Sequence, residues 1–186
     1  MPPPTDSHFT EHLAAARAGD RDAWTELYRA HAPAVLGFLR TQHPAAAEDL
    51  CADAFAGACR DIDQFTGDDE DFRRWILSIA RNRLIDLRRA DQRRPQTAGG
   101  DMPDQPFTDA GFATAEARAD STERIESLLG ELAPDQRAVL YLRFVLDLDQ
   151  RDVATVLKMS IASVKMAQLR GSRKLAQRMN SDRDAQ

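Results

Sequence analysis

A cluster of helix-breaking residues near the middle of the chain does most to limit its fold. Three of the nine prolines and three of the nine glycines of this 186-residue chain lie within residues 95–111, and no helical repeat of apolar residues runs through them. A structureless stretch of this length is unusual inside one compact domain. We therefore predict two domains and a flexible linker between them, with disordered tails: 1–10 (tail), 11–94 (first domain), 95–122 (linker), 123–180 (second domain) and 181–186 (tail).

Both halves of the chain have a helical pattern. Apolar residues recur at intervals of three and four on each side of the linker, and the alternation typical of strands is missing. Asp20, Pro44 and the Thr66-Gly67 break indicate helix starts in the first half, and Pro134 indicates one in the second. The sequence thus predicts an all-α fold of two small helical domains, with no sheet.

The charge of the chain is unevenly distributed. The formal net charge is −5, which argues against a nucleic-acid-binding protein because such domains are usually basic. Residues 95–130 account for all of it, whereas 72–94 contain eight arginines and 153–181 contain six cations and no acid. The pattern predicts two locally basic helices joined by an acidic linker, although cations at a solvated helix end would give a similar pattern.

The second half contains the pattern of a helix-turn-helix. Asp149 to Asp152 resembles a capping box, Lys158-Met159 supplies a turn, and Ser160 is placed to cap a second helix. In a helix-turn-helix the second helix presents its N-terminal residues to the major groove, and later cations meet phosphate. An ordinary helical hairpin has the same periodicity, but the caps, the turn length and the acid-free second helix favour DNA binding. We expect Gln168 to be half-buried in this hairpin.

Several classes of protein are excluded by what the sequence lacks. No apolar run approaches the length of about 20 residues that a membrane span needs, and the N-terminus does not resemble a signal peptide. No catalytic triad, phosphate loop or metal-ligand set stands out. We expect a cytoplasmic protein without membrane insertion, with no catalytic or metal site, no cofactor and no small-molecule substrate, and hence not an enzyme.

Residues 72–89 carry the most specific motif. They read Phe-x-x-Trp-Ile-x-x-Ile-Ala-Arg-Asn-x-x-x-Asp-x-x-Arg, which resembles the promoter-melting helix of the extracytoplasmic-function group of the sigma-70 family. Segments before and after this helix resemble other parts of the same family: Gly19-Asp20, Leu27-Tyr28, His31, Ala47 to Leu50, Phe55, Leu132, Pro134, Arg137, Leu140 and Leu142-Arg143. The resemblance covers 9–94 and 123–178.

The resemblance implies a dissociable initiation subunit of bacterial RNA polymerase. In this family the second domain reads the minus-35 promoter element as duplex DNA, and the first domain opens the minus-10 element. The implied partners are core RNA polymerase and promoter DNA. Many members are held inactive by an anti-sigma factor wedged between the domains, but nothing in this sequence identifies one. The acidic linker either threads into the polymerase, as it does in the family, or is a plain spacer.

The resemblance also assigns candidate site residues. Core-polymerase binding is assigned to Glu48, Asp49, Leu50 and Phe55; minus-10 DNA to Arg81, Asn82, Arg88 and Arg89; and minus-35 DNA to Ser163, Lys165, Met166, Arg170 and Arg173. Trp75 shares the face of Phe72, Ile76 and Ile79, so we expect it in the core rather than as a stacking platform for bases.

The chain departs from the family pattern in one loop and at Ala52 and Ala167. Ala52 stands where the family usually has glutamine in its core-binding helix. The family's loop before the melting helix captures a flipped base, and here, over 64–71, it contains four consecutive acids at 68–71, which should weaken the approach of the DNA backbone. Ala167 stands where an arginine often follows the Val-Lys pair, which should remove one DNA contact.

Two other functions remain open on the sequence. A free-standing helix-turn-helix regulator would bind duplex DNA alone, without polymerase. An α-helical enzyme or adaptor would use the acidic loop as its site.

Overall fold

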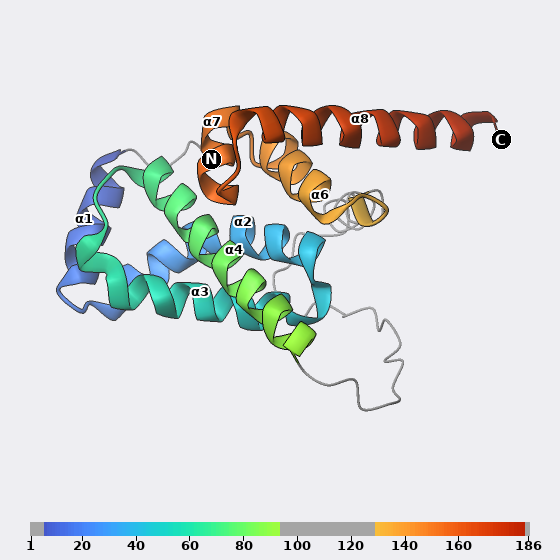
Figure 1. Ribbon diagram of the computed structural model, residues 1–186. Helices are drawn as coiled ribbons and strands as arrows, with labels where there is room; N and C mark the ends of the chain where they lie inside the picture. The colour runs from blue at the N-terminus through green and yellow to red at the C-terminus, as the bar shows by residue number, and fades with distance from the viewer. Residues whose placement is uncertain (1–5, 94–128, 185–186) are drawn as a thin grey trace.

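The computed structural model describes residues 6–93 and 129–184, and every regular element within them is helical. The first part of the chain forms α1 (Asp6–Arg17), α2 (Arg21–Gln42), η1 (Pro44–Ala46), α3 (Ala47–Asp61), η2 (Ile62–Gln64) and α4 (Asp69–Arg93). The second part forms α6 (Pro134–Leu140), the π-helical turn η3 (Tyr141–Val145), α7 (Gln150–Leu157) and α8 (Ile161–Asp184) (Figure 1). The predicted all-α fold is confirmed. The predicted linker at 95–122 lies outside the described residues.

Helix starts follow the predicted signals. The Asp20 carboxylate accepts hydrogen bonds from the backbone N–H groups of Asp22 and Ala23, and α2 begins directly after it. Pro44 opens the short turn η1, from which α3 continues, and Pro134 occupies the first turn of α6. These starts agree with the sequence because the capping oxygen and the fixed φ of proline act locally.

Both predicted tails contain residues that the structure places in helices. Helix α1 begins at Asp6, inside the predicted tail 1–10, and Phe9 on this helix is buried. Phe9 packs against Phe65 and Phe72, with ring centroids 6.5 and 5.7 Å away, so burial of this aromatic ring accounts for order so near the terminus. Helix α8 continues to Asp184, through most of the tail predicted at 181–186.

The first domain packs α4 against α2 and α3. Phe72, Ile76 and Leu77 of α4 are completely buried, as are Val35 and Leu39 of α2. This confirms the inward face expected for Phe72 and Ile76, which recurs at the helical interval of four.

The second domain is built around the hairpin of α7 and α8, with α6 packed beside it. Val153, Val156 and Val164 are completely buried between these helices. Gly171 lies where α8 crosses α6, and a Cβ atom there would come within 2.9 Å of Leu140 Cδ1. Only glycine lets the two helices pack this closely.

The two domains pack against each other. Helix α7 lies against α4, helix α6 lies against α2 (Figure 1), and a continuous cluster of buried residues runs through both domains. Arg137 of α6 donates a hydrogen bond to the Thr41 carbonyl of α2 over 2.7 Å. Within 6–93 and 129–184, no helix combines the length and apolarity needed to span a membrane.

Candidate nucleic-acid interface

The helix-turn-helix predicted from Asp149 onward is present, with α7 as its first helix and α8 as its second. Asp149 accepts hydrogen bonds from the backbone N–H groups of Arg151 and Asp152, over 2.7 and 2.8 Å, and so caps α7. The turn has Lys158 in the left-handed region, with φ of 48°. Ser160 Oγ accepts from the Ser163 N–H over 3.0 Å at the start of α8. The expected capping box is only half formed, because the Asp152 carboxylate pairs with Arg74 of α4 instead of turning back to the start of α7.

Helix α8 presents one face to its hairpin partner and another to solvent. All five residues predicted to contact the minus-35 element are exposed: Ser163, Lys165, Met166, Arg170 and Arg173. Gln168 is half-buried, as predicted, and accepts a hydrogen bond from Gln150 Nε2 over 3.2 Å. Ala167 is buried and also lines a cavity beside the first turns of α8, and its predicted removal of a DNA contact stays a prediction.

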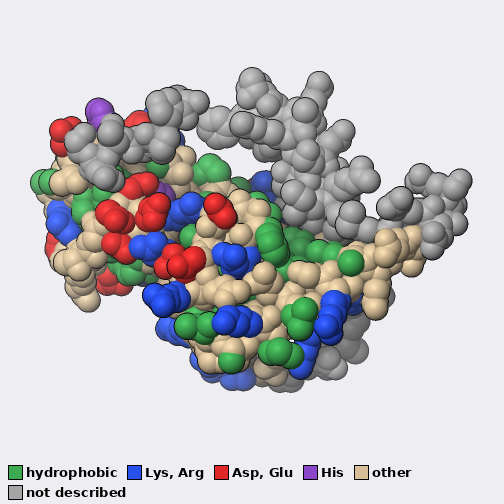
Figure 2. All heavy atoms as spheres, turned by 90° about the horizontal axis from the view of Figure 1, so that it is seen from above, with side chains coloured by type: hydrophobic (Ala, Val, Ile, Leu, Met, Phe, Trp, Pro, Cys, Tyr) green, Lys and Arg blue, Asp and Glu red, His purple; other side chains and the backbone are tan. Residues whose placement is uncertain are grey.

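The exposed side of α8 mixes cations with apolar side chains. Ile161, Met166 and Leu169 are each more than two-fifths exposed. Figure 2 shows Lys and Arg side chains interspersed with hydrophobic ones over this part of the molecule, while Asp and Glu gather at the end formed by α1 and the start of α4. Such a face offers cations for phosphates and apolar contacts for thymine methyl groups.

A cavity of about 540 Å³ opens beside the first turns of α8. Ser163, Met166 and Arg170 line it together with Asp135 and Gln136 of α6. Three predicted minus-35 residues therefore share one hollow. Sequence reasoning missed Asp135 and Gln136, because only the fold brings α6 next to α8.

The four predicted minus-10 residues of α4 differ in accessibility. Arg89 is exposed, whereas Arg81, Asn82 and Arg88 are partly buried. Arg88 donates to the Gln42 carbonyl and to Gln42 Oε1, over 3.2 and 3.3 Å. Burial lowers the pKa of Arg81, and the nearby Asp135 opposes this shift. Arginine stays charged at neutral pH in either case, but of these four residues only Arg89 is classed as exposed.

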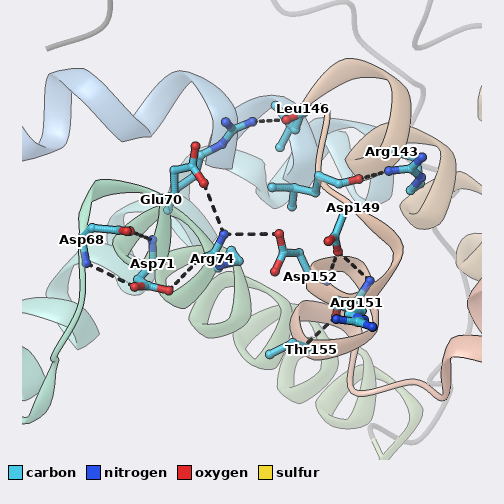
Figure 3. Close-up of polar contacts among 12 residues, drawn as sticks. Asp68, Glu70, Asp71, Arg74, Arg143, Leu146, Asp149, Arg151, Asp152 and Thr155 are labelled. Carbon is cyan, nitrogen blue, oxygen red and sulfur yellow. Dashed lines mark hydrogen bonds and ion pairs between the residues drawn. The ribbon is translucent and has the colours of Figure 1, made fainter. Parts of the chain in front are cut away.

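The acidic loop before α4 is organised by its own carboxylates (Figure 3). Asp68 Oδ1 accepts from the Asp71 N–H over 2.8 Å, and Asp71 Oδ2 accepts from the Asp68 N–H over 3.2 Å, which forms a reciprocal capping box. Arg74 also donates to Asp71, and these hydrogen bonds hold the pKa of the Asp71 carboxyl below its ordinary value.

The other two acids of the loop also have partners. Asp69 Oδ1 lies 3.1 Å from Nε2 of the buried His31, and Glu70 Oε2 lies 3.6 Å from Arg74 Nη1. Each carboxylate of 68–71 is thus engaged with a protein group, so the loop's negative field is reduced. Its predicted effect on the approach of DNA stays a prediction.

A second cavity, of about 510 Å³, lies between this loop and α7. Its lining residues are Gln64, Phe65, Thr66, Asp71, Arg74, Trp75 and Ser78 from the first domain and Asp152 and Thr155 from α7. The ring centroids of Trp75 and Phe65 are 5.1 Å apart. Trp75 is only partly buried: it packs against the core and also lines the cavity. The sequence prediction of a core role therefore describes only one side of this residue.

The predicted polymerase-binding residues divide into two pairs. Glu48 and Asp49 are exposed at the start of α3, whereas Leu50 and Phe55 are buried. Tyr28 of α2 is 46% exposed and lies on Phe55, with ring centroids 4.7 Å apart. The sequence analysis did not include Tyr28 among the candidate polymerase-binding residues. Its exposure could have been inferred, because its neighbour Leu27 lies on the buried face of α2 and the next residue of a helix points away from that face.

Comparison with known families identifies two matching segments. The sequence profile described as Sigma-70 region 2 matches residues 27–94, and the one described as Sigma-70, region 4 matches residues 122–175. Together they cover most of both packed domains, without α1 and the start of α2, and leave out the part of the chain between the domains.

Curated proteins of the same kind match over most of the chain. It is 29% identical to the ECF RNA polymerase sigma factor BldN of Streptomyces coelicolor, over 95% of this chain and 67% of BldN. It is 26% identical to the ECF RNA polymerase sigma factor SigD of Mycobacterium tuberculosis, over 88% of this chain and 80% of SigD.

Two solved structures share the fold. CnrH in complex with the cytosolic domain of CnrY superposes with a TM-score of 0.65 and 23% identity, covering 94% of this chain and 99% of CnrH. The sigma factor RpoE from Bartonella quintana, in complex with the anti-sigma factor NepR, superposes with a TM-score of 0.63 and 18% identity, covering 85% and 97%.

Proposed function

The chain belongs to the extracytoplasmic-function group of the sigma-70 family, and from that premise we propose how its described residues direct RNA polymerase to promoters. A sigma factor is a transcription initiation subunit rather than a catalyst, so we assign no catalytic residue and place its action in the cytoplasm, with core polymerase. One observation supports this assignment of DNA-binding roles most strongly: the same molecule contains α8, whose first turns are exposed and free of acids, and the arginine-rich helix α4.

Helix α8 reads the minus-35 element in this proposal. Ser163 and Met166 lie near its N-terminus and reach base edges in the major groove, which admits one helix. Lys165, Arg170 and Arg173 contact the flanking phosphates. All five side chains are exposed, so this face needs little rearrangement to meet DNA.

Helix α4 and the loop before it hold the opened minus-10 strand. Arg89 supplies an exposed cation for the backbone, and the cavity beside Phe65 and Trp75 supplies aromatic surface for an unstacked base. Arg81, Asn82 and Arg88 extend this surface along α4. The paired Asp71 and Arg74 offer both an acceptor and donors at the mouth of the cavity.

The surface formed by Tyr28, Glu48 and Asp49 binds core polymerase in this proposal. Exposed aromatic side chains carry much of the energy of protein interfaces, and carboxylates at the rim provide orientation. Buried Leu50 and Phe55 hold this surface in place from below rather than contact the polymerase.

An anti-sigma protein is a further proposed partner. The related RpoE from Bartonella quintana is seen in complex with the anti-sigma factor NepR. We extend this kind of control to the present chain. Affinity capture of the full chain from its own cells should recover a stoichiometric partner that blocks transcription by the reconstituted holoenzyme, and a captured protein without that effect would contradict the extension.

Run-off transcription tests the proposed roles. Core polymerase from the source cell, supplied with the full chain and a library of genomic fragments, should give discrete transcripts that depend on the chain. Absence of such transcripts, together with tight duplex binding by the chain alone, would favour a regulator that acts without polymerase.

A further inference from the structure

Two arginine side chains converge where α3 packs against α4 (Figure 1). Gly57 of α3 is buried, and a Cβ atom there would lie 3.2 Å from Arg83 Nη2 and 3.7 Å from Arg60 Nη2. The two nitrogen atoms are therefore no farther apart than the sum of these distances, about 6.9 Å. Arg60 of α3 is exposed and Arg83 of α4 is half-buried, so the pair lies at the surface of the first domain.

Gly57 makes room for this pair. Glycine weakens the interior of a helix relative to alanine, and Gly57 lies inside α3. A side chain at this position would meet both guanidinium groups, and it would also come within 3.4 Å of Ile79 Cγ2. The sequence thus leaves empty the one backbone position over which the two arginines meet.

The pair has no counter-charge in the part of the chain that the structure describes. There, neither Arg60 nor Arg83 makes a hydrogen bond or an ion pair. Asp86, three residues after Arg83 on α4, lies 4.0 Å from Arg89 instead. The helix dipole accounts for a cation such as Arg60 in the last turn of α3, but Arg83 lies in the middle of α4. Two neighbouring cations without a partner favour an anion as the group that completes the site.

The position of the pair points to the opened minus-10 strand. Trp75, which lines the cavity that we assign to an unstacked base, is followed by Ile79 and Arg83 at intervals of four along α4. Arg83 is therefore about 12 Å from Trp75 along the helix axis, at about 1.5 Å per residue. A DNA strand rises about 3.4 Å per nucleotide in a stacked duplex, so it covers this distance in a few nucleotides.

A phosphodiester fits the chemistry of the pair. The planar guanidinium group matches the oxygens of phosphate, and each charge-assisted N–H···O bond is about 2.8 Å long. Two such bonds to different oxygens of one phosphate bridge the gap between Arg60 and Arg83. A carboxylate of polymerase is the competing partner, but Arg60 lies about 18 Å along α3 from Glu48, at the opposite end of the helix from the surface proposed for polymerase.

We propose that Arg60 and Arg83 together bind one phosphate of the opened minus-10 strand, a few nucleotides from the base held in the cavity. This inference rests on the proposed role of α4 in holding that strand. The phosphate supplies the negative charge that the pair lacks. In return, the pair fixes the strand against the α3 side of α4 once the base has left the duplex.

Binding of the holoenzyme to a pre-opened promoter tests the pair. The DNA is the promoter found by the run-off experiment, labelled and held open over its minus-10 element by mismatches, and fluorescence anisotropy gives the affinity over a salt series. The variants are Arg60→Gln, Arg83→Gln and the double variant. The matched control is a second double variant, Arg21→Gln with Arg178→Gln, which removes the same charge from exposed positions on α2 and α8.

Each single variant should weaken binding by about two- to fivefold, the range typical of one partly screened ion pair. The double variant should lose less than the product of the two single losses, because both side chains act on one phosphate. It should also reduce the slope of log affinity against log salt by about 0.7, the value for one phosphate of a single strand. The control should stay close to the parent.

Circular dichroism checks that each variant is folded. Arg60 is exposed, so Arg60→Gln keeps the test valid even where the half-buried Arg83 contributes to packing. Isothermal titration of core polymerase with the full-length double variant, without DNA, measures any loss of affinity for polymerase itself. We expect the affinity of the parent in this second measurement.

Every other outcome overturns a stated part of the inference. Affinity and slope equal to those of the control remove the pair from the DNA contact. A fall in slope of about 1.4 indicates two separate phosphates and overturns the shared site. Weakened binding of core polymerase assigns the pair to a carboxylate of that partner instead. Failure of the parent holoenzyme to bind the opened promoter overturns the proposed function, and the role of the pair with it.

Discussion

The arginines of this chain show how one residue type takes different roles at different positions. Arg74 is held by three carboxylates, Arg88 by Gln42, and Arg89 is exposed near Asp86, at the limit of ion-pair distance. The count of arginines in 72–94 predicted a basic helix. It gave no indication of which cations are free for DNA, because Gln42 of α2 and Asp152 of α7 reach these arginines only in the folded molecule.

Arg170 tests the assignment of α8 at the level of one side chain. Replacing it with alanine should weaken binding of the holoenzyme to a minus-35 duplex and reduce the slope of log affinity against log salt by about one, since one phosphate contact is lost. Fluorescence anisotropy over a salt series measures this slope. Arg178→Ala is the matched control, because Arg178 lies on the same helix and pairs with Glu131. An unchanged slope for Arg170→Ala would place that side chain away from the phosphates.

His31 should make stability depend on pH. Burial lowers its pKa below the ordinary value, and this outweighs the opposing effect of Asp69. The unfolded chain therefore binds the proton more readily, so the stabilisation is present above the unfolded pKa of about 6.5 and is lost as the pH falls towards the folded value.

Urea unfolding across this pH range measures the effect of His31. His31→Gln should flatten the dependence of the free energy of unfolding on pH between neutral and mildly acidic conditions. His8→Gln, at an exposed histidine, should keep the parent's dependence. Equal curves for the parent and His31→Gln would contradict the buried, neutral imidazole.

At the scale of elements, the sequence predicted where helices start more accurately than it predicted which side chains are exposed. Asp20, Asp149 and Ser160 cap helices as expected, because a cap depends on residues two or three positions away. Leu50 and Phe55 are buried although the sequence marks them as candidates for contact with a partner, and Cys59 is exposed whereas Cys51 on the same helix is buried. These outcomes depend on which helices cover α3, and periodicity alone leaves that undetermined.

Gly67 controls the shape of the loop before α4. Its φ of 144° lies in the region that side chains rarely adopt, and a Cβ atom there would lie 2.6 Å from the Asp71 Cβ. Gly67→Ala should lower the free energy of unfolding by about 1–3 kcal/mol, as is usual for strained backbone.

Chemical denaturation of matched alanine variants measures the effect of this glycine. Gly130→Ala serves as the control, because the space around its Cβ position is open, and it should change stability by less than about 1 kcal/mol. A loss in Gly67→Ala no larger than that of the control would show that the loop relaxes freely.

At the scale of the whole molecule, the sequence predicted two helical domains and their order but not their contact. Arg74 and Asp152 are 78 positions apart, and no pattern in either half identifies the other as its partner. The contact between Tyr141 and Gly37 likewise becomes visible only once α2 and η3 are seen together. Contacts between amphipathic helices are selected by the shape of whole surfaces, so a reading of separate segments leaves them out.

Tyr28 tests the proposed surface for core polymerase. Tyr28→Ala should weaken the complex with core polymerase by about tenfold, the effect of an aromatic side chain at the centre of an interface. Isothermal titration of core polymerase with the full chain measures this affinity. Glu11→Gln, at an exposed position on α1, should leave it unchanged, and equal affinities for both variants would move the interface elsewhere.

The central claim is that this one chain brings polymerase to a promoter and opens it there. Permanganate probing of unpaired thymines tests this most directly, on a promoter chosen by the run-off experiment. We predict reactive thymines around the minus-10 element only when both the full chain and core polymerase are present, and weaker reactivity with Arg89→Ala. Reactivity with core polymerase alone, or none with the complete holoenzyme at a bound promoter, would contradict the claim.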